Sequence, residues 1–327
     1  MMTTAPALDA GAAPAAAPRK PVSRRRRRRI REAVLPYLLV APLILAVVVA
    51  LGWPLLQQFV MSLQNYGLEQ QFGAAPEWVG FANYAQIMTD PSMWIVFVRS
   101  VLFCAVSASL SMVIGMLVAL LLTKVSAWAR IALQVTLLLV WAMPALVTMV
   151  IWQWLFDARY GLVNWVLARV GFPDMAAYPW TSTTIGVFTI AALAVIWGSL
   201  PLIIFMIYSA LTQVPTEVLE AADLDGAGPW KRFREVTLPL ITPAVMIVGL
   251  LQIVWDLRVF TQIYVLQQAG VSVDETNLLG TYIYRVGIGQ GSYGDASALA
   301  TVVLILTLLL TWRYIAKMFA QQKEATE

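Results

Sequence analysis

The chain has 327 residues, of which 60% are hydrophobic and only 12% are charged. Soluble domains are usually about 45–50% apolar and about 25% charged, so one ordinary core cannot bury this excess of apolar residues. The absence of histidine and the single cysteine, Cys104, exclude a disulfide within the chain and remove the commonest general base and a common zinc ligand. The composition favours a protein embedded in a lipid bilayer, with neither catalytic residues nor a metal site.

Residues 1–33 precede any long apolar segment and are predicted to form a basic cytoplasmic tail. Residues 1–23 are rich in Ala and Pro and predict disorder. Arg24–Arg29 and Arg31 follow and indicate an anchor at the membrane surface. A signal peptide is the alternative, but the apolar stretch from Val34 to about Val60 is too long for its hydrophobic region, and no clear cleavage site follows.

Six apolar segments follow, each long enough to cross a bilayer, since a spanning helix needs about 20 apolar residues. They cover residues 35–62, 94–122, 131–155, 184–211, 237–261 and 297–316. Prolines within them (Pro42, Pro54, Pro144, Pro201 and Pro243) are tolerated where neighbouring helices satisfy the freed carbonyls. We therefore predict an all-α integral membrane protein with six transmembrane helices in residues 34–318, followed by a cytoplasmic tail, 319–327.

The positions of lysine and arginine predict the orientation, because basic residues concentrate in cytoplasmic segments. With the N-terminus inside, 17 of the 22 basic residues are inside: nine before the first helix, two between helices 2 and 3, three between helices 4 and 5, and three after helix 6. The other five lie outside or near outer helix ends: Arg99, Arg159, Arg169, Arg258 and Arg285. Both termini are therefore expected to be cytoplasmic. Because the positive charge clusters at membrane ends, no nucleic-acid partner is expected.

Residues 213–239, between the fourth and fifth segments, are predicted to form two short helices on the cytoplasmic side. Thr216 is suited to cap the first, and Gly226 to end it, since glycine accepts left-handed backbone angles. Gly228-Pro229 then restarts a helix, because proline suits a first helical position. The two helices would form a compact knob; an interfacial helix lying on lipid headgroups is the alternative that composition leaves open.

This loop resembles the EAA signature of ATP-binding-cassette importer permeases. Glu220-Ala221-Ala222 is followed after three residues by Gly226, and after nine more by Val236-Thr237-Leu238-Pro239, with Val236 where the family usually has Ile. The resemblance implies the type I importer permease fold and a loop that docks in a cleft of a nucleotide-binding subunit. Glu220 would face basic residues of that ATPase, and Gly226 would provide the sharp turn. The expected coupling residues are Glu220, Ala221, Ala222, Asp223, Gly226, Leu238 and Pro239.

The chain itself lacks a recognisable ATP site. None of its five lysines follows a glycine, so the phosphate-binding loop G-x-x-x-x-G-K-[ST] is absent. We expect a transport subunit rather than an enzyme, without a cofactor of its own, whose energy comes from ATP and magnesium bound by a partner ATPase dimer.

Further segments resemble the maltose- and glycerol-phosphate-type sugar permeases, so that the resemblance covers most of residues 34–318. Trp78–Tyr84 followed by Asp90-Pro91 is similar to their first external loop, and Val259–Leu266 to their segment after the fifth helix. Tyr282–Tyr284 and Gly291–Ala298 are similar to their approach to the sixth helix. This implies import of a carbohydrate, of di- or oligosaccharide size, across the inner (plasma) membrane. The implied partners are a second homologous permease subunit and an extracytoplasmic sugar-binding protein.

The sequence also departs from that branch. Thr261 stands where an acidic residue is frequent, and Gln267-Gln268-Ala269 replaces a turn rich in Thr and Gly. These departures leave the identity of the sugar open.

Polar residues of the fifth helix are the first candidates for substrate contacts. Gln252 and Asp256 are four residues apart and therefore share one face of that helix. Polar groups in lipid are costly and normally face a cavity or a protein partner, and an amide and a carboxylate suit sugar hydroxyls. Arg258, two residues further on, is expected to point elsewhere.

The resemblance to the maltose-type permease adds three positions. It implies Ser199 on the fourth helix, and Trp141 and Ala145 around Pro144, as substrate contacts. A tryptophan ring is suited to stack on the apolar face of a sugar. The alternative is that Trp141 and Ser199 are plain helix-packing residues and that Gln252 bonds another helix.

The mechanism that the resemblance implies is alternating access driven by the ATPase. One alternative is an importer of the same superfamily for glycerol phosphate, polyamine, phosphate or molybdate; an anionic substrate would require basic residues in the cavity, and no helix centre contains any. Another is a secondary carrier or channel, which inverted repeats or a charged relay would indicate; neither is evident.

Overall fold

The computed structural model describes Tyr37 and residues 39–324, with side chains described as far as Met318. The predicted disordered tail 1–33, with Arg24–Arg29, and the last residues, 325–327, lie outside the described residues. The chain divides into two units, Met1–Gln57 and Gln58–Glu327. Nearly all the fold, and every candidate site residue, belongs to the second unit.

The described part of the first unit is one apolar helix. It contains a π-helical turn, η1 (Val48–Gly52), and continues into α2 (Trp53–Ser62). The π turn ends two residues before Pro54, whose missing N–H interrupts the regular hydrogen-bond ladder. Leu39–Ser62 as a whole is long and apolar enough to cross a membrane, and none of its most apolar stretch is buried. Such a helix requires lipid or another protein around it.

The second unit begins with a small hairpin. Strand β1 (Gln64–Asn65) pairs antiparallel with β2 (Glu77–Trp78), with Gln64 opposite Trp78, and α3 (Leu68–Gln71) lies between them. The next helix, α4 (Ala82–Thr89), supports the hairpin, because the Asn83 amide donates to the carbonyl oxygens of Ser62 and Gln64, both at 2.9 Å.

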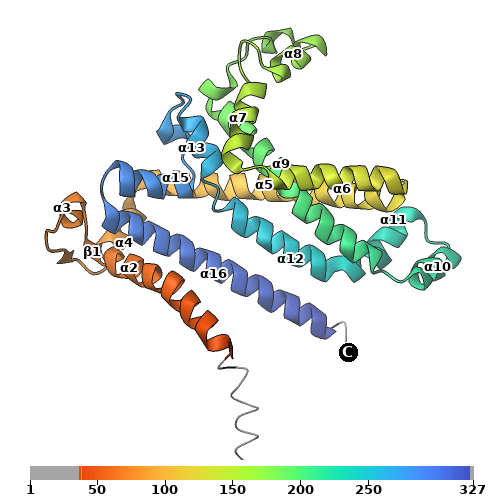
Figure 1. Ribbon diagram of the computed structural model, residues 1–327, viewed down its shortest axis with the longest axis horizontal. Helices are drawn as coiled ribbons and strands as arrows, with labels where there is room; N and C mark the ends of the chain where they lie inside the picture. Colours follow the sequence, from red (N-terminus) through yellow and green to blue (C-terminus); the bar gives the residue numbers. More distant parts are fainter. Residues whose placement is uncertain (1–36, 38, 325–327) are drawn as a thin grey trace, which may run out of the picture. The chain divides into compact units, whose positions relative to one another are not determined.

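Long apolar helices make up most of the second unit (Figure 1). They are α5 (Pro91–Lys124), α6 (Ala127–Ala142), α7 (Ala145–Leu155), α9 (Thr184–Thr212), α12 (Leu238–Asp256) and α16 (Tyr293–Glu324). Helix α5 begins where the Asp90 carboxylate accepts from the Ser92 N–H at 2.8 Å and Pro91 occupies the first turn, as favoured at helix starts. Helix α16 extends to Glu324, well past the predicted end of the sixth helix.

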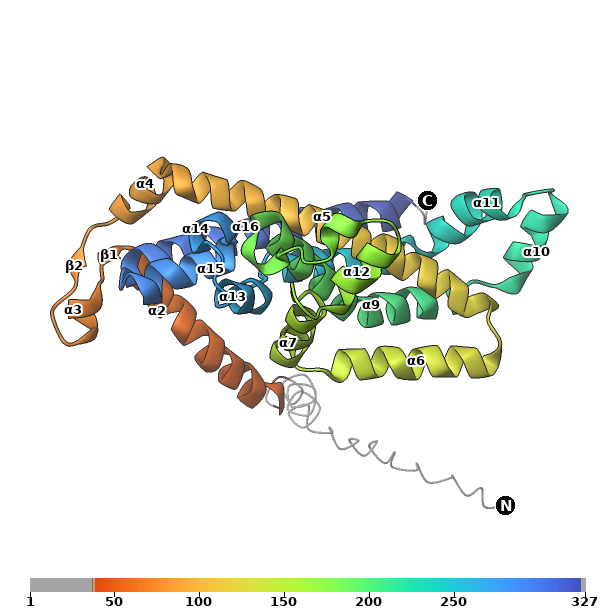
Figure 2. The same cartoon turned by 90° about the horizontal axis from the view of Figure 1, so that it is seen from above.

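Shorter elements connect these helices. They are α8 (Leu162–Arg169), η2 (Pro173–Met175), η3 (Trp180–Ser182), α10 (Thr216–Leu224), α11 (Pro229–Arg232), η4 (Phe233–Thr237), α13 (Thr261–Gln267), α14 (Val273–Thr276), α15 (Leu279–Tyr284) and η5 (Arg285–Gly289). The α10–α11 loop and the β1–β2 hairpin lie at opposite ends of the long helices (Figures 1 and 2).

The third predicted helix, 131–155, is not a single helix. It is divided into α6 and α7, which are bent by 104° at Met143 and Pro144. Proline removes a backbone donor and disfavours a helical conformation in the residue before it, and Met143 is extended, with ψ 129°. Among the described residues, five single helices are long and apolar enough to span a membrane, and the bent pair makes a sixth if it is counted as one span.

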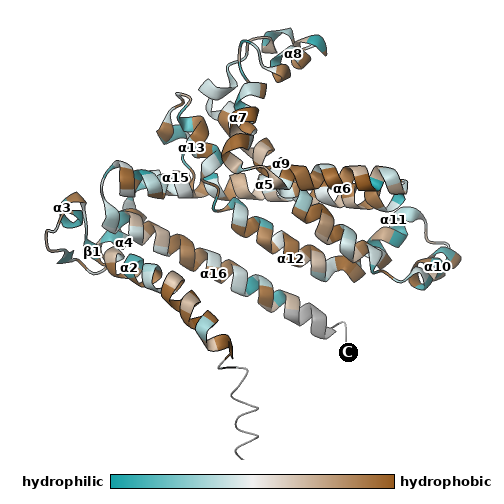
Figure 3. Ribbon diagram, viewed as in Figure 1, coloured by the Kyte–Doolittle hydropathy of each residue, from teal (hydrophilic) through white to brown (hydrophobic). Residues whose placement is uncertain are grey.

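Helix α9 is the central helix of the bundle. Of its most apolar stretch 56% is buried, against 33% for α5 and 17% for α16. It packs along α5, where Gly115 lies so close to Ile203 that an added Cβ would be 2.4 Å from the Ile203 Cγ2. Hydrophobic residues predominate along the long helices, and hydrophilic residues are more frequent in the connecting segments (Figure 3). The exposed apolar faces suit contact with lipid or protein.

Candidate functional site

A cavity of about 330 Å³ lies where two helix breaks meet. One break is the bend between α6 and α7 at Pro144, and the other is the non-helical segment 257–260 between α12 and α13. Helix α9 supplies the third wall. The two breaks and α9 all belong to segments that are predicted to cross the membrane. The cavity therefore lies within the transmembrane region rather than in a surface loop.

Three of the predicted substrate contacts are joined in one hydrogen-bonded network. The Gln252 amide donates to the Ser199 hydroxyl at 3.0 Å and to the Asp256 Oδ1 at 2.9 Å. Ser199 is 8% exposed, and Gln252 and Asp256 are each 2% exposed. The Asp256 Oδ2 is buried without a hydrogen-bond partner among the described residues. The pair at positions i and i+4 thus shares one face of α12, as predicted, and Gln252 also bonds another helix, α9, as the alternative interpretation held.

Of these three residues, Ser199 and Asp256 line the cavity together with both remaining candidates, Trp141 and Ala145. Trp141 remains 58% exposed. Two further tryptophans line the same cavity: Trp197 on α9 and Trp255 on α12. Neither was predicted from the sequence. Aromatic faces beside a carboxylate and hydroxyl groups suit a ligand with both apolar and hydrogen-bonding surfaces.

As expected, Arg258 forms neither a hydrogen bond nor an ion pair with Asp256 among the described residues. Arg258 is nevertheless one of the residues that line the cavity. It follows the end of α12 at Asp256, where helical spacing no longer predicts which residues share a face. The lining of the cavity therefore includes one basic residue, so an anionic substrate is not excluded by a lack of basic residues. The only feature of the sequence that could have predicted Arg258 as a cavity residue is its proximity to Asp256. The helix break between α12 and α13 is not marked by Gly or Pro.

The α10–α11 loop has the predicted two-helix form. Gly226 has φ +75°, its N–H donates to the Asp223 carbonyl at 3.1 Å, and the Ala227 N–H donates to the Ala222 carbonyl at 3.0 Å. This is the pattern of a Schellman motif with glycine in the left-handed conformation. Pro229 occupies the first turn of α11, as predicted. Thr216 does not cap α10: Pro215 precedes the helix, and no side-chain cap is formed there.

The predicted coupling residues differ in accessibility. Glu220, Ala221 and Pro239 are exposed, whereas Ala222 is buried and Leu238 packs against the α5–α9–α12 core. The Asp223 carboxylate forms an ion pair with Arg232 of α11. The chain then runs from α11 through η4 into α12, so that a continuous helical run, Pro229–Asp256, leads from the loop to the cavity.

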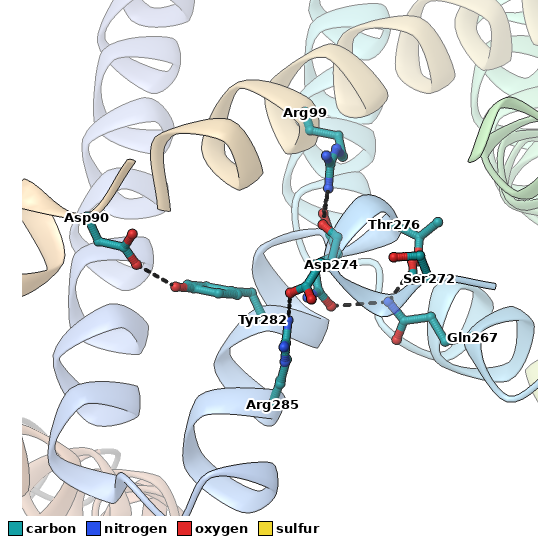
Figure 4. Close-up of polar contacts among 9 residues, drawn as sticks. Asp90, Arg99, Gln267, Ser272, Asp274, Thr276, Tyr282 and Arg285 are labelled. Carbon is teal, nitrogen blue, oxygen red and sulfur yellow. Dashed lines mark hydrogen bonds and ion pairs between the residues drawn. The ribbon is translucent and has the colours of Figure 1, made fainter. Parts of the chain in front are cut away.

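A polar network lies at the end of the long helices opposite the α10–α11 loop (Figures 1 and 4). The Arg99 guanidinium on α5 donates to the carbonyl oxygens of Asp274 and Asn277, both at 3.2 Å, and Arg285 forms an ion pair with Asp274. The Tyr282 hydroxyl donates to the Asp90 carboxylate at 2.9 Å. Burial, and then this contact with Asp90, raise the pKa of Tyr282 to about 12, so the phenol remains a donor at physiological pH. The network fastens the α14–α15 segment to the start of α5.

These features define a class: a multi-pass helical membrane permease with a polar cavity between broken helices and a projecting two-helix loop. The chain belongs to the family described as "Binding-protein-dependent transport system inner membrane component", which it matches over residues 111–324. The matched region contains both the cavity and the α10–α11 loop. Membership of this family excludes the secondary carrier or channel considered above.

Curated relatives and solved structures agree with this family. The chain is 37% identical to the "Diacetylchitobiose uptake system permease protein DasB" of Streptomyces coelicolor, with 89% of each chain covered. It is 31% identical to the "Trehalose/maltose transport system permease protein MalF" of Thermococcus litoralis, covering 88% of this chain and 94% of the relative. The fold is similar to a chain of a bacterial alginate ABC transporter solved in complex with an alginate pentasaccharide-bound periplasmic protein (TM-score 0.74, 18% identity, 88% and 94% covered).

Proposed function

We propose that the chain is a permease subunit of an ATP-driven importer that moves a carbohydrate of di- or oligosaccharide size inward across the inner membrane. The observation that carries this proposal is the cavity where the Ser199–Gln252–Asp256 network meets three tryptophans at two helix breaks. Sugars present hydroxyl groups at their edges and apolar C–H faces, which match these two kinds of lining. The names of the diacetylchitobiose and trehalose/maltose relatives support the same class of substrate.

Each polar group of the cavity has a distinct part in this proposal. Asp256 accepts hydrogen bonds from sugar hydroxyls, with Gln252 and Ser199 holding its side chain in place. Arg258 donates to sugar oxygens, and Trp141, Trp197 and Trp255 stack against ring faces. Discontinuous helices are a recurring feature of transporter binding sites, because the breaks expose polar groups and allow the two halves to move separately. Trp141 and Trp255 remain 58% and 45% exposed, which suits completion of the site by a second, homologous permease subunit.

Coupling to ATP is assigned to the α10–α11 loop. Both termini and this loop lie in the cytoplasm, where a partner ATPase dimer binds the loop, with Glu220 facing basic residues of that partner. An extracytoplasmic binding protein delivers the sugar at the opposite end. ATP binding draws the loops of the two permease subunits together and exposes the cavity outward, and hydrolysis returns it inward. ATP hydrolysis supplies the energy for directed transport, and the sugar shifts the balance between these states only through its different affinity for each.

A carbohydrate with an acidic substituent is the second candidate substrate. The observation that favours it is Arg258 on the cavity wall. Competition of uptake by neutral and by acidic disaccharides separates the two candidates, since each competes only where its own class of sugar is bound.

Replacement of Asp256 by Asn tests the cavity assignment. Loss of a charge-assisted hydrogen bond costs about 1.5–3 kcal/mol, so we expect Asp256→Asn to raise the KM of uptake by about 10- to 100-fold. Uptake is measured in proteoliposomes that contain the complete transporter and its binding protein, with a panel of disaccharides. Asp174→Asn is the control for the same chemical change, because Asp174 is exposed and does not line the cavity. An unchanged KM of Asp256→Asn for every transported sugar would show that this cavity is not the substrate site.

A further inference from the structure

Asp223 and Arg232 face each other across the turn of the α10–α11 loop. The Nη1 atom of Arg232, on α11, contacts both carboxylate oxygens of Asp223, on α10. Their side chains are 34% and 52% exposed, for Arg232 and Asp223 respectively. The resemblance to the EAA signature implies that Asp223 contacts the ATPase, whereas here its carboxylate is engaged within the loop itself.

The turn between the two short helices contains two glycines. Residues 225–228 include Gly226 and Gly228, and glycine restricts the backbone less than any other residue. Gly226 in the left-handed conformation sets the direction of the turn, but a turn of this kind does not by itself prevent α10 from swinging about α11. The ion pair adds a second connection between the helices, on the far side of the turn.

The position of Arg232 links this connection to the cavity. Arg232 belongs to α11, which continues through η4 into α12 as one helical run, Pro229–Asp256. The same segment carries Gln252 and Asp256 near its other end. At 1.5 Å per residue, roughly 30 Å of helix separates Arg232 from Gln252. A displacement of α10 reaches the cavity along this helix only if α10 moves together with α11.

We infer that Asp223 and Arg232 are positioning residues. Their ion pair, called the clip below, holds α10 against α11, so that movement of the ATPase displaces α12 and does not merely bend the glycine turn. This inference rests on the proposed function of the loop. Asp223 thereby sets the orientation of the exposed docking face, including Glu220 and Leu224, and does not itself contact the ATPase. In water an exposed ion pair contributes little to folding stability, but within a partner's cleft it loses solvent screening and strengthens. The clip therefore acts on coupling more than on folding.

Single neutralisations and a charge exchange test the clip. In the reconstituted transporter we expect Asp223→Asn and Arg232→Gln each to raise the number of ATP molecules hydrolysed per sugar transported, by up to about fivefold, the upper range for exposed ion pairs. The double variant Asp223→Arg with Arg232→Asp restores most of the coupling. Asp225→Asn and Arg234→Gln, exposed neighbours outside the pair, make the same charge changes and should leave coupling unchanged. If the exchange fails to rescue, or the single variants behave like these controls, the clip is wrong.

A distance measurement tests the clip without reference to transport. In a Cys104→Ser background, spin labels at Glu217→Cys on α10 and Glu235→Cys on η4 report the distance between the two parts by electron–electron double resonance. We expect a narrow distance distribution in the parent protein and in the charge exchange, and a broader one in Asp223→Asn and Arg232→Gln. Equal widths overturn the clip, even where sugar uptake is normal. A broadening in a complex that transports no sugar instead retains the clip and counts against the proposed function.

Discussion

Gly226 shows how a single backbone angle determines the shape of the α10–α11 loop. Its φ of +75° lies in the left-handed region, and no neighbouring atom lies within 4 Å of the position that a Cβ would take. A substitution here is therefore strained by conformation and not by collision. Gly228 lies two residues away at φ −64° with equally open surroundings, so it is free of that strain.

Substitutions of Gly226 distinguish the effect of its left-handed backbone conformation from the effect of side-chain size. We expect Gly226→Ala to destabilise the loop by about 1–2 kcal/mol, the cost of placing an L residue in the left-handed region, and to lower the affinity of the permease for its ATPase. Gly226→Asn should have a smaller effect, because asparagine adopts this conformation more readily. Binding of the ATPase to the permease in detergent measures both effects. Gly228→Ala is the control, and an equal loss in that variant would mean that side-chain size at the loop matters, and not the left-handed angle.

The residues of the cavity differ in whether their position could be predicted from the sequence. Gln252 and Asp256 were predictable from their spacing, since four residues place side chains on one helical face. Arg258 was not, because it follows the end of α12 and its direction depends on how the chain leaves the helix. Trp197 and Trp255 carry no sequence feature that distinguishes a cavity tryptophan from one that faces lipid.

Among the described elements, α5 and α9 form the most extensive contact between two helices. Gly115 of α5 meets Ile203 of α9, which is fully buried. Small residues on one helix allow the backbones of two membrane helices to approach, and packing then replaces the hydrophobic effect as the attraction between them. The pair therefore determines how closely α5 lies against the central helix.

We expect Gly115→Ala to destabilise the bundle by about 1–3 kcal/mol, the usual cost of overpacking a core. The added Cβ would lie 2.4 Å from the Ile203 Cγ2, so one of the helices must shift. Thermal unfolding of the purified protein in detergent, followed by circular dichroism, should show a lower Tm. Gly198→Ala on α9, where no neighbouring atom lies within 4 Å of the added Cβ, should leave the Tm unchanged or raise it, since alanine favours helix over glycine by about 0.5–1 kcal/mol. A Tm of Gly115→Ala at or above that of the parent contradicts the packing described for this contact.

The bend at Pro144 was only partly evident from the sequence. A proline within an apolar segment predicts a kink, but membrane helices also accommodate proline without a break, as α9 does at Pro201 and α12 at Pro243. The extended conformation of Met143 and the 104° bend depend on the packing of α7 against α9 and α13. The same packing places Trp141 and Ala145 on either side of the bend, at the cavity.

For the whole molecule, the distribution of basic residues leads to a prediction of sidedness. In a Cys104→Ser background, a cysteine in place of Leu224 should react with a membrane-impermeant maleimide only after the cells are opened, whereas a cysteine in place of Phe72 should react in intact cells. Leu224 and Phe72 are 90% and 84% exposed, so access to both depends on the side of the membrane and not on burial. Their elements lie at opposite ends of the long helices (Figure 2). Labelling of Leu224→Cys in intact cells would reverse the orientation and remove the loop from the reach of any ATPase.

Features that depend on neighbours along the chain were predictable from the amino-acid sequence. The apolar segments follow from the length of their hydrophobic runs, the turn at Gly226 from glycine's conformational range, and the shared face of Gln252 and Asp256 from helical spacing. Which of these parts meet depends on the three-dimensional packing of the helices. That packing joined Ser199 to Gln252, brought two helix breaks to one cavity, placed Arg258 on its wall and paired Asp223 with Arg232. Such contacts depend on packing between separate helices and on side-chain direction beyond a helix end, which local patterns do not specify.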